Sequence, residues 1–64
     1  MFIELEEIIS SGITAGKKRP IAVNTEKISS LTPVDHKGHG TQISLRRGTI
    51  QVTESYEEIL RKLN

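Results

Sequence analysis

The sequence contains no cysteine, so neither a disulfide nor a thiolate-bound zinc ion can stabilise the fold. The absence of thiols suits a reducing compartment, and the acidic start "MFIELEEIIS" differs from the basic start of a secretory signal. No apolar run approaches the roughly 18–20 residues that a membrane-spanning helix needs. We therefore expect a cytoplasmic protein without a membrane span.

Aromatic residues are almost absent, since Phe2 and Tyr56 are the only two in 64 residues. Both are expected in the core, which leaves no stacking platform of the kind that single-strand nucleic-acid binders use. The hydrophobic content is 34% and mostly aliphatic. Burying one such side chain contributes roughly 1.5–3 kcal/mol, whereas ordering each residue costs about 1.5 kcal/mol. We expect one domain over residues 1–64, whose thin core favours a homo-oligomer or a bound partner.

Charge is distributed unevenly, although the net charge is only +1. Residues 1–16 carry three glutamates and no base, giving −3. Residues 17–47 carry seven bases and two acids, giving +5, and residues 48–64 carry two bases and three acids, giving −1. The basic middle indicates either an anionic partner or contact with the acidic ends of the same fold.

Apolar and polar residues alternate in three stretches, which is typical of strands with one covered face. The first stretch opens the chain, and the second, residues 20–33, is interrupted by a turn or bulge at Asn24-Thr25. A segment rich in glycine and serine at about 10–20 and a polar segment at about 35–40 are predicted as loops.

The third stretch, "TQISLRRGTIQVT", predicts a β-hairpin. Ile43 and Leu45 share one face of the first arm, and the second arm shows the same alternation. We place Arg47-Gly48 at the turn, because glycine supplies the positive φ that tight hairpin turns need.

The last residues predict a helix. Ser55 and Glu58 have the spacing of a capping box, in which each side chain bonds the other residue's backbone amide. One apolar stripe follows at helical spacing, made of Tyr56, Ile59, Leu60 and Leu63. That stripe must cover something, and the strands offer the only sizeable apolar surface. The expected fold class is α+β, a small antiparallel sheet of four to five strands covered by one C-terminal helix.

The pattern "IAVNTEKISSLTPV…GTQISLRRGTIQVTESYEEILRKL" resembles the small FlbD-like proteins over roughly residues 20–63. In that family a "V-N-x-x-x-I" segment, a short hairpin and a "V-x-E-S-x-E-E-V/I" helix start follow an N-terminal strand. The matching positions are Val23, Asn24, Ile28, Ile43, Leu45, Gly48, Val52, Glu54, Ser55, Glu57, Glu58 and Ile59. The resemblance implies an accessory or regulatory protein of flagellar gene clusters, or of phages and mobile elements, and it supplies no catalytic residue. This chain departs from the pattern in the loops at 10–20 and 35–40.

Five basic residues are candidates for contact with an anion or a nucleic acid, namely Lys17, Lys18, Arg19, Arg46 and Arg47. Several converging bases, with Lys37 as a further member, would neutralise phosphates. The alternative is a merely solvated loop and turn. The sequence does not establish whether these residues converge.

Asp35, His36 and His39 form the pattern D-H-x-x-H, whose side chains are ligands for zinc or nickel. A structural zinc site needs four ligands and only three are at hand. Histidines in a polar, glycine-containing loop are more often solvent-exposed. We predict no metal and no cofactor.

The sequence has no nucleophile elbow and no phosphate-binding glycine loop, so we expect no enzymatic activity. The favoured interpretation is a non-enzymatic protein-interaction module that self-associates or docks on a partner protein through exposed strand edges. The alternative is a weak nucleic-acid-binding regulatory protein that uses the basic residues within 17–47.

Overall fold

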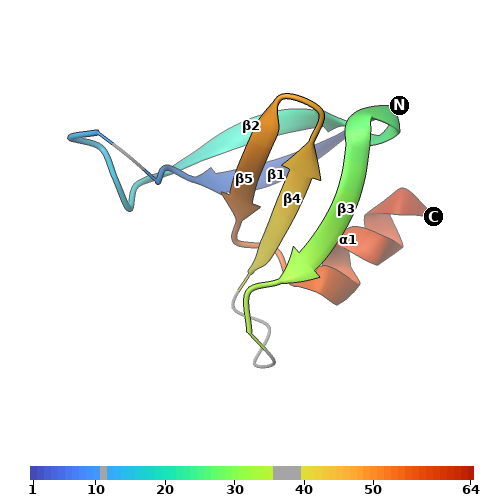
Figure 1. Ribbon diagram of the computed structural model, residues 1–64. Helices are drawn as coiled ribbons and strands as arrows, with labels where there is room; N and C mark the ends of the chain where they lie inside the picture. Colours follow the sequence, from blue (N-terminus) through green and yellow to red (C-terminus); the bar gives the residue numbers. More distant parts are fainter. Residues whose placement is uncertain (11, 36–39) are drawn as a thin grey trace.

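The chain folds as a five-stranded antiparallel sheet with one C-terminal helix, as seen in a computed structural model that describes residues 1–10, 12–35 and 40–64 (Figure 1). The strand order is β2-β1-β5-β4-β3. The elements are β1 (Phe2–Ile8), β2 (Lys18–Asn24), a 3₁₀ turn η1 (Thr25–Lys27), β3 (Ile28–Pro33), β4 (Thr41–Leu45), β5 (Gly48–Val52) and α1 (Tyr56–Leu63). The predicted α+β class is confirmed.

The β1–β2 hairpin is longer than the sequence predicted. β2 begins at Lys18, inside the stretch expected to be a loop, and pairs there with Ile8. Arg19 lies opposite Glu7, and its Nε donates to the Glu7 carboxylate at 2.7 Å. The strand continues through Pro20, because its nitrogen points away from β1 and no ladder hydrogen bond is lost there.

The β4–β5 turn is shifted by one residue from the predicted position. Leu45 pairs with Gly48, so the turn consists of Arg46 and Arg47. Neither arginine has a positive φ, whereas Gly48 has a φ of +158°. The turn therefore presents two adjacent arginines at the tip of the hairpin.

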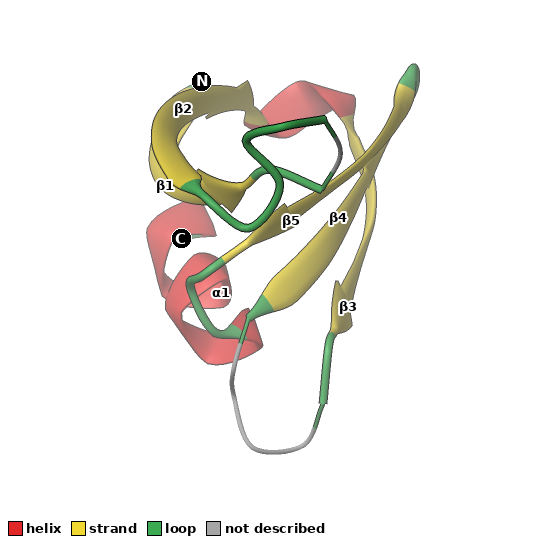
Figure 2. Cartoon of the chain, turned by 90° about the vertical axis from the view of Figure 1, so that its left-hand side faces the viewer, coloured by secondary structure: helices red, strands yellow, loops and turns green. Residues whose placement is uncertain are grey.

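The core lies on the inner face of the curved sheet. Its buried hydrophobic residues come from four strands and the helix: Ile3, Leu5, Val23, Ile43, Val52 and Ile59. Figure 2 shows α1 and the β1–β2 hairpin on the same side of the β5–β4–β3 part of the sheet. The capping box between Ser55 and Glu58 starts the helix at this position, as the sequence predicted. The helix thus covers one end of the inner face.

The helix buries a narrower stripe than the sequence suggested. Ile59 is fully buried and Leu63 packs against the core, but Tyr56 and Leu60 are 37% and 39% exposed. Phe2 is 67% exposed, because it alternates with the buried Ile3 and so points to the outer face. The expectation that both aromatic residues lie in the core is wrong. An eight-residue helix contacts the sheet along one line only.

β1 and β5 are paired over only a short part of each strand. Only two residue pairs connect them, Glu7↔Val52 and Ile8↔Gln51. One further backbone bond follows, from the Thr53 amide to the Glu6 carbonyl at 2.9 Å. After Thr53 the chain turns away from β1 into α1, so the first half of β1 has no neighbouring strand on its β5 side.

Two side chains bind backbone groups of β1 where the strand partner is missing. The Glu6 amide donates to both carboxylate oxygens of Glu54, at 3.1 Å each. The Lys62 ammonium donates to the Glu4 carbonyl at 2.9 Å and lies 4.0 Å from the Glu54 carboxylate. The residue that precedes the N-cap of α1 and the last turn of the helix are therefore both bonded to β1. Figure 1 shows the two chain termini on the same side of the molecule.

Gly40 and Thr41 pack the start of β4 closely against the end of β5. Gly40 has a φ of +136°, and a Cβ there would lie 2.6 Å from the Val52 carbonyl oxygen. Thr41 is fully buried, and its hydroxyl donates to the Glu54 carbonyl at 2.9 Å. This close packing leaves no room for a side chain at position 40.

Gly40→Ala is expected to lower the free energy of unfolding by about 3 kcal/mol or more, because backbone strain and overpacking add at this position. The matched control is Gly16→Ala. Gly16 has a φ of +87° with open space around it, so only the strain of about 1–2 kcal/mol applies. Urea unfolding measures both. Equal losses in the two variants would contradict the close approach of Gly40 to Val52.

Candidate functional site

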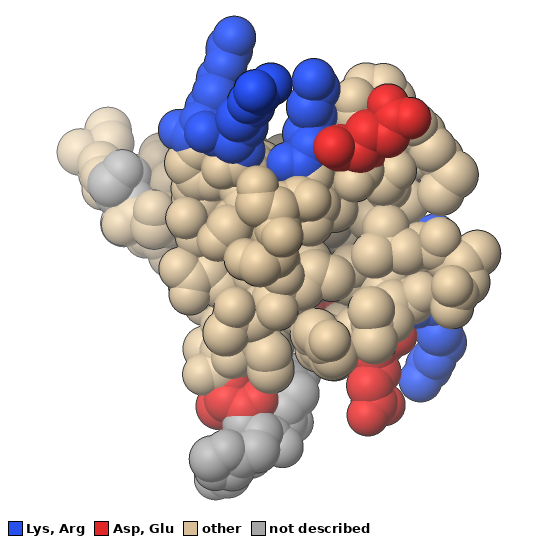
Figure 3. Space-filling view, turned by 45° about the vertical axis from the view of Figure 1, so that its right-hand side comes forward, with Lys and Arg blue, Asp and Glu red and all other residues tan. Residues whose placement is uncertain are grey.

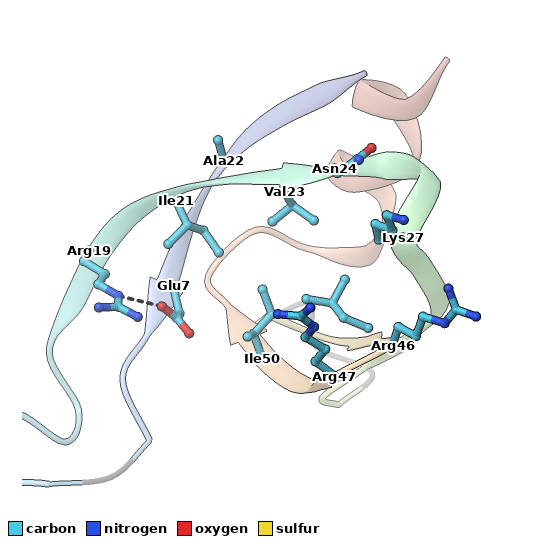
Figure 4. Close-up of a pocket in the computed structure, with 11 residues that line it drawn as sticks. Glu7, Arg19, Ile21, Ala22, Val23, Asn24, Lys27, Arg46, Arg47 and Ile50 are labelled. Carbon is cyan, nitrogen blue, oxygen red and sulfur yellow. Dashed lines mark hydrogen bonds and ion pairs between the residues drawn. The ribbon is translucent and has the colours of Figure 1, made fainter.

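An open groove of about 560 Å³ lies between β2 and the β4–β5 hairpin (Figure 4). Its floor is aliphatic and comes from both sides: Ile21 and Val23 from β2, Leu45 from β4 and Ile50 from β5. Ile21 pairs with the buried Leu5, and Ile50 pairs with the buried Ile43, so the floor belongs to the inner face of the sheet. The groove is the part of that face that α1 does not cover.

The floor remains accessible to solvent. Ile21, Leu45 and Ile50 are only partly buried, although all three pack against the core. In Figure 4, Ile21 and Val23 point from β2 toward Ile50, while Ala22 points away from it. The groove therefore exposes aliphatic side chains that belong to a continuous apolar surface.

The rim of the groove is cationic. Four basic residues line it, namely Arg19, Lys27, Arg46 and Arg47, against one acid, Glu7. Four positive charges and one negative charge leave a net charge of +3. Arg19 forms an ion pair with Glu7. The Arg19 side chain is 62% exposed, whereas the Glu7 side chain is 13% exposed. In the described part of the chain, the other three bases of the rim have no ion pair.

Local structure explains why these bases meet. The two-residue turn presents Arg46 and Arg47, and Figure 4 shows Arg47 folded back over the floor while Arg46 points outward. Asn24 accepts a hydrogen bond from the Glu26 amide at 3.1 Å, which fixes η1 and with it Lys27. Figure 3 shows Lys and Arg side chains projecting together from one end of the molecule.

The structure brings together three of the five basic residues that the sequence singled out. Arg19, Arg46 and Arg47 line the groove, whereas Lys17 and Lys18 do not. Lys18 alternates with Arg19 along β2 and so belongs to the other face. Sequence reasoning missed Lys27 as a site residue. The available signal was its position directly after the Asn24 turn.

The predicted D-H-x-x-H pattern lies mostly outside the described residues, which include Asp35 but not His36 and His39. Lys37 lies outside them as well. Among residues 1–10, 12–35 and 40–64, no group of three His, Cys, Asp or Glu side chains is placed to hold a metal ion. In the same ranges no helix is long and apolar enough to cross a membrane.

The free edge of β2 is a poor template for an added strand. The β1–β2 ladder has an Ile9–Lys17 bond at one end and a Thr25–Met1 bond at the other, both 2.8 Å long. The backbone N–H and C=O groups of odd-numbered β2 residues therefore point toward β1, and those of even-numbered residues point toward the free edge. Pro20 falls on the outward side, where it has no N–H to donate.

The free edge of β3 is blocked in the same way. The Val34 amide donates to the Gly40 carbonyl at 3.1 Å. The backbone groups of the even-numbered residues therefore point toward β4, and the nitrogen of Pro33 points toward the free edge. A register shift between Ile28 and Ser30 distorts the edge further. Docking through strand edges, as the sequence suggested, is disfavoured at both edges, and the groove is the better docking surface.

No protein-family model matches this chain, and neither the curated proteins nor the solved structures gave a match. The FlbD-like resemblance stays a prediction from the residues that carry it. Several of those residues have structural roles here: Asn24 caps η1, Glu54 binds the Glu6 amide, and Ser55 with Glu58 caps α1.

The paired substitution Arg46→Ala/Arg47→Ala is expected to change the free energy of unfolding by less than about 0.5 kcal/mol, because both side chains are exposed. For comparison, Ile43→Ala should cost about 2–5 kcal/mol, since Ile43 is 0% exposed. Chemical denaturation monitored by circular dichroism measures both. A loss above about 1 kcal/mol in the arginine variant would mean that the rim supports the fold.

Proposed function

We propose that this chain is a non-enzymatic protein-interaction module that docks a partner through the groove between β2 and the β4–β5 hairpin. The observation that carries this proposal is a partly exposed aliphatic floor beside a rim of net charge +3. Lys27, Arg46 and Arg47 make no ion pair within the described ranges, so they are available to an acidic partner.

The two parts of the groove contribute differently to binding. Covering the floor removes apolar area from water, at about 25 cal/mol per Å². Exposed cations at the rim contribute little energy each, but they orient a partner and raise the association rate. This combination suits recognition of another protein surface that is both apolar and charged.

The resemblance to FlbD-like proteins supports an accessory or regulatory role. The absence of cysteine supports a cytoplasmic location, and we propose no cofactor. The small buried core also supports association, because a chain of 64 residues gains stability from any partner that binds its folded state. That partner is either a second copy of this chain or a different protein.

A photo-crosslinking residue tests the groove in the native host. Placed at Ile50 on the floor, it should give a discrete crosslinked product. Placed at the neighbouring Thr49, which is exposed and does not line the groove, it should not. A product of twice the chain's mass would identify a second copy. No product at Ile50, or equal products at both positions, would contradict docking in the groove.

A second candidate function, weak nucleic-acid binding, is favoured by the convergence of four bases at one groove. It predicts retention of DNA or RNA at low salt that falls steeply as salt rises, and loss of retention in Arg46→Ala/Arg47→Ala. The floor argues against it, since aliphatic side chains offer no ring on which a base can stack. Filter binding of labelled DNA and RNA over a salt series tests this function. Absence of retention at low salt would eliminate this function.

A further inference from the structure

We infer that the groove binds a segment of a different protein that carries aliphatic side chains together with carboxylates. This inference rests on the proposed function and names the chemistry of the partner. Its basis is the combination, in one site, of an aliphatic floor and three basic side chains, Lys27, Arg46 and Arg47, without ion pairs in the described residues.

The charge of the rim selects among possible segments. A basic segment would bring like charges against a rim of net charge +3. A purely apolar segment would cover the floor but would also displace water from the cations of the rim. The hydrogen bonds between that water and the cations would not be replaced, which costs free energy. A segment with carboxylates beside its aliphatic side chains satisfies both the floor and the rim.

The ion pair inside the groove shows how a carboxylate is held there. The Glu7 carboxylate accepts from Nε of Arg19 at 2.7 Å, and this is the contact that Glu7 makes with the guanidinium. The remaining nitrogens of Arg19 belong to a side chain that is 62% exposed at the groove. A partner carboxylate can therefore bind the remaining nitrogens of Arg19 from the solvent side, where the negative charge of the neighbouring Glu7 weakens its binding.

The chain's own acidic segments do not fit this role. β1 combines acidic and aliphatic residues, but it is paired along its whole length with β2. In α1, Ile59 is buried in the core, and Glu57 lies 3.9 Å from Arg61. β1 cannot leave its partner strand without unfolding, and α1 exposes a single aliphatic side chain, Leu60, beside its glutamates. Both facts favour a different protein as the occupant.

The experiment uses three labelled heptapeptides and fluorescence anisotropy on the full chain. The first peptide has two leucines flanked by glutamates. In the second the glutamates are glutamines, and in the third the leucines are serines. The first should bind, and more weakly as salt rises. The other two should each bind at least about tenfold more weakly, because each lacks one of the two required features.

Matched variants assign the binding to the groove. Arg46→Ala/Arg47→Ala should weaken the glutamate-leucine peptide about tenfold, whereas Lys17→Ala/Lys18→Ala, with the same change in charge, should not, because those lysines do not line the groove. Glu7→Gln should strengthen binding a few-fold, since Arg19 is released from its internal carboxylate. A variant that merely lost structure would not bind more tightly.

The outcomes separate this inference from the proposed function. Equal binding of the glutamate and glutamine peptides, or equal effects of the two double variants, would overturn the inference even if the crosslink at Ile50 forms. Binding of none of the peptides would overturn it as well. A crosslinked product that proves to be a second copy of the chain would replace the inferred partner. Absence of any crosslink at Ile50 would remove the proposed function itself.

Discussion

The brief contact between β1 and β5 determines most of this structure. Two residue pairs and one further backbone bond join the strands before the chain turns into α1. Backbone amides and carbonyls that lack a strand partner are open to other hydrogen-bond partners, and here side chains occupy two of them. Glu54 binds the Glu6 amide, and Lys62 binds the Glu4 carbonyl. The position of the helix therefore follows from hydrogen bonds that replace a missing strand, as well as from burial of Ile59.

The same constraint leaves the groove open. An eight-residue helix that lies near β3 and is bonded to β1 through Lys62 covers one end of the inner face. The curvature of the sheet places β2 opposite the β4–β5 hairpin at the other end. The floor packs against the core, so the residues exposed for binding also contribute to stability. The rim does not share this double role, because Arg46 and Arg47 lie on an exposed turn. Affinity and stability can therefore change independently at the rim but not at the floor.

Local sequence patterns predicted the elements well, and side-chain contacts between distant elements account for what they missed. Alternation and the capping box at Ser55 identified the strands and the helix, because these signals depend on neighbouring residues. The exposure of Phe2 follows from the alternation in β1, because Phe2 shares a strand face with Glu4 and Glu6, opposite the buried Ile3 and Leu5. The prediction that Phe2 is buried gave its aromatic character more weight than this pattern. The convergence of Lys27 with Arg46 depends on strand order, which local patterns do not encode. Proline at the outward positions of both free edges became informative only once the register was known.

Amide hydrogen exchange along β1, measured by NMR, tests most directly whether Glu54 replaces the missing strand. The Glu6 amide, bound to the Glu54 carboxylate, should exchange more slowly than the Glu4 amide, which faces no strand. In Glu54→Ala the Glu6 amide should exchange as fast as the Glu4 amide, while the Leu5 amide, on the β2 side, remains protected. Equal rates for Glu4 and Glu6 in the unmodified chain would contradict this account.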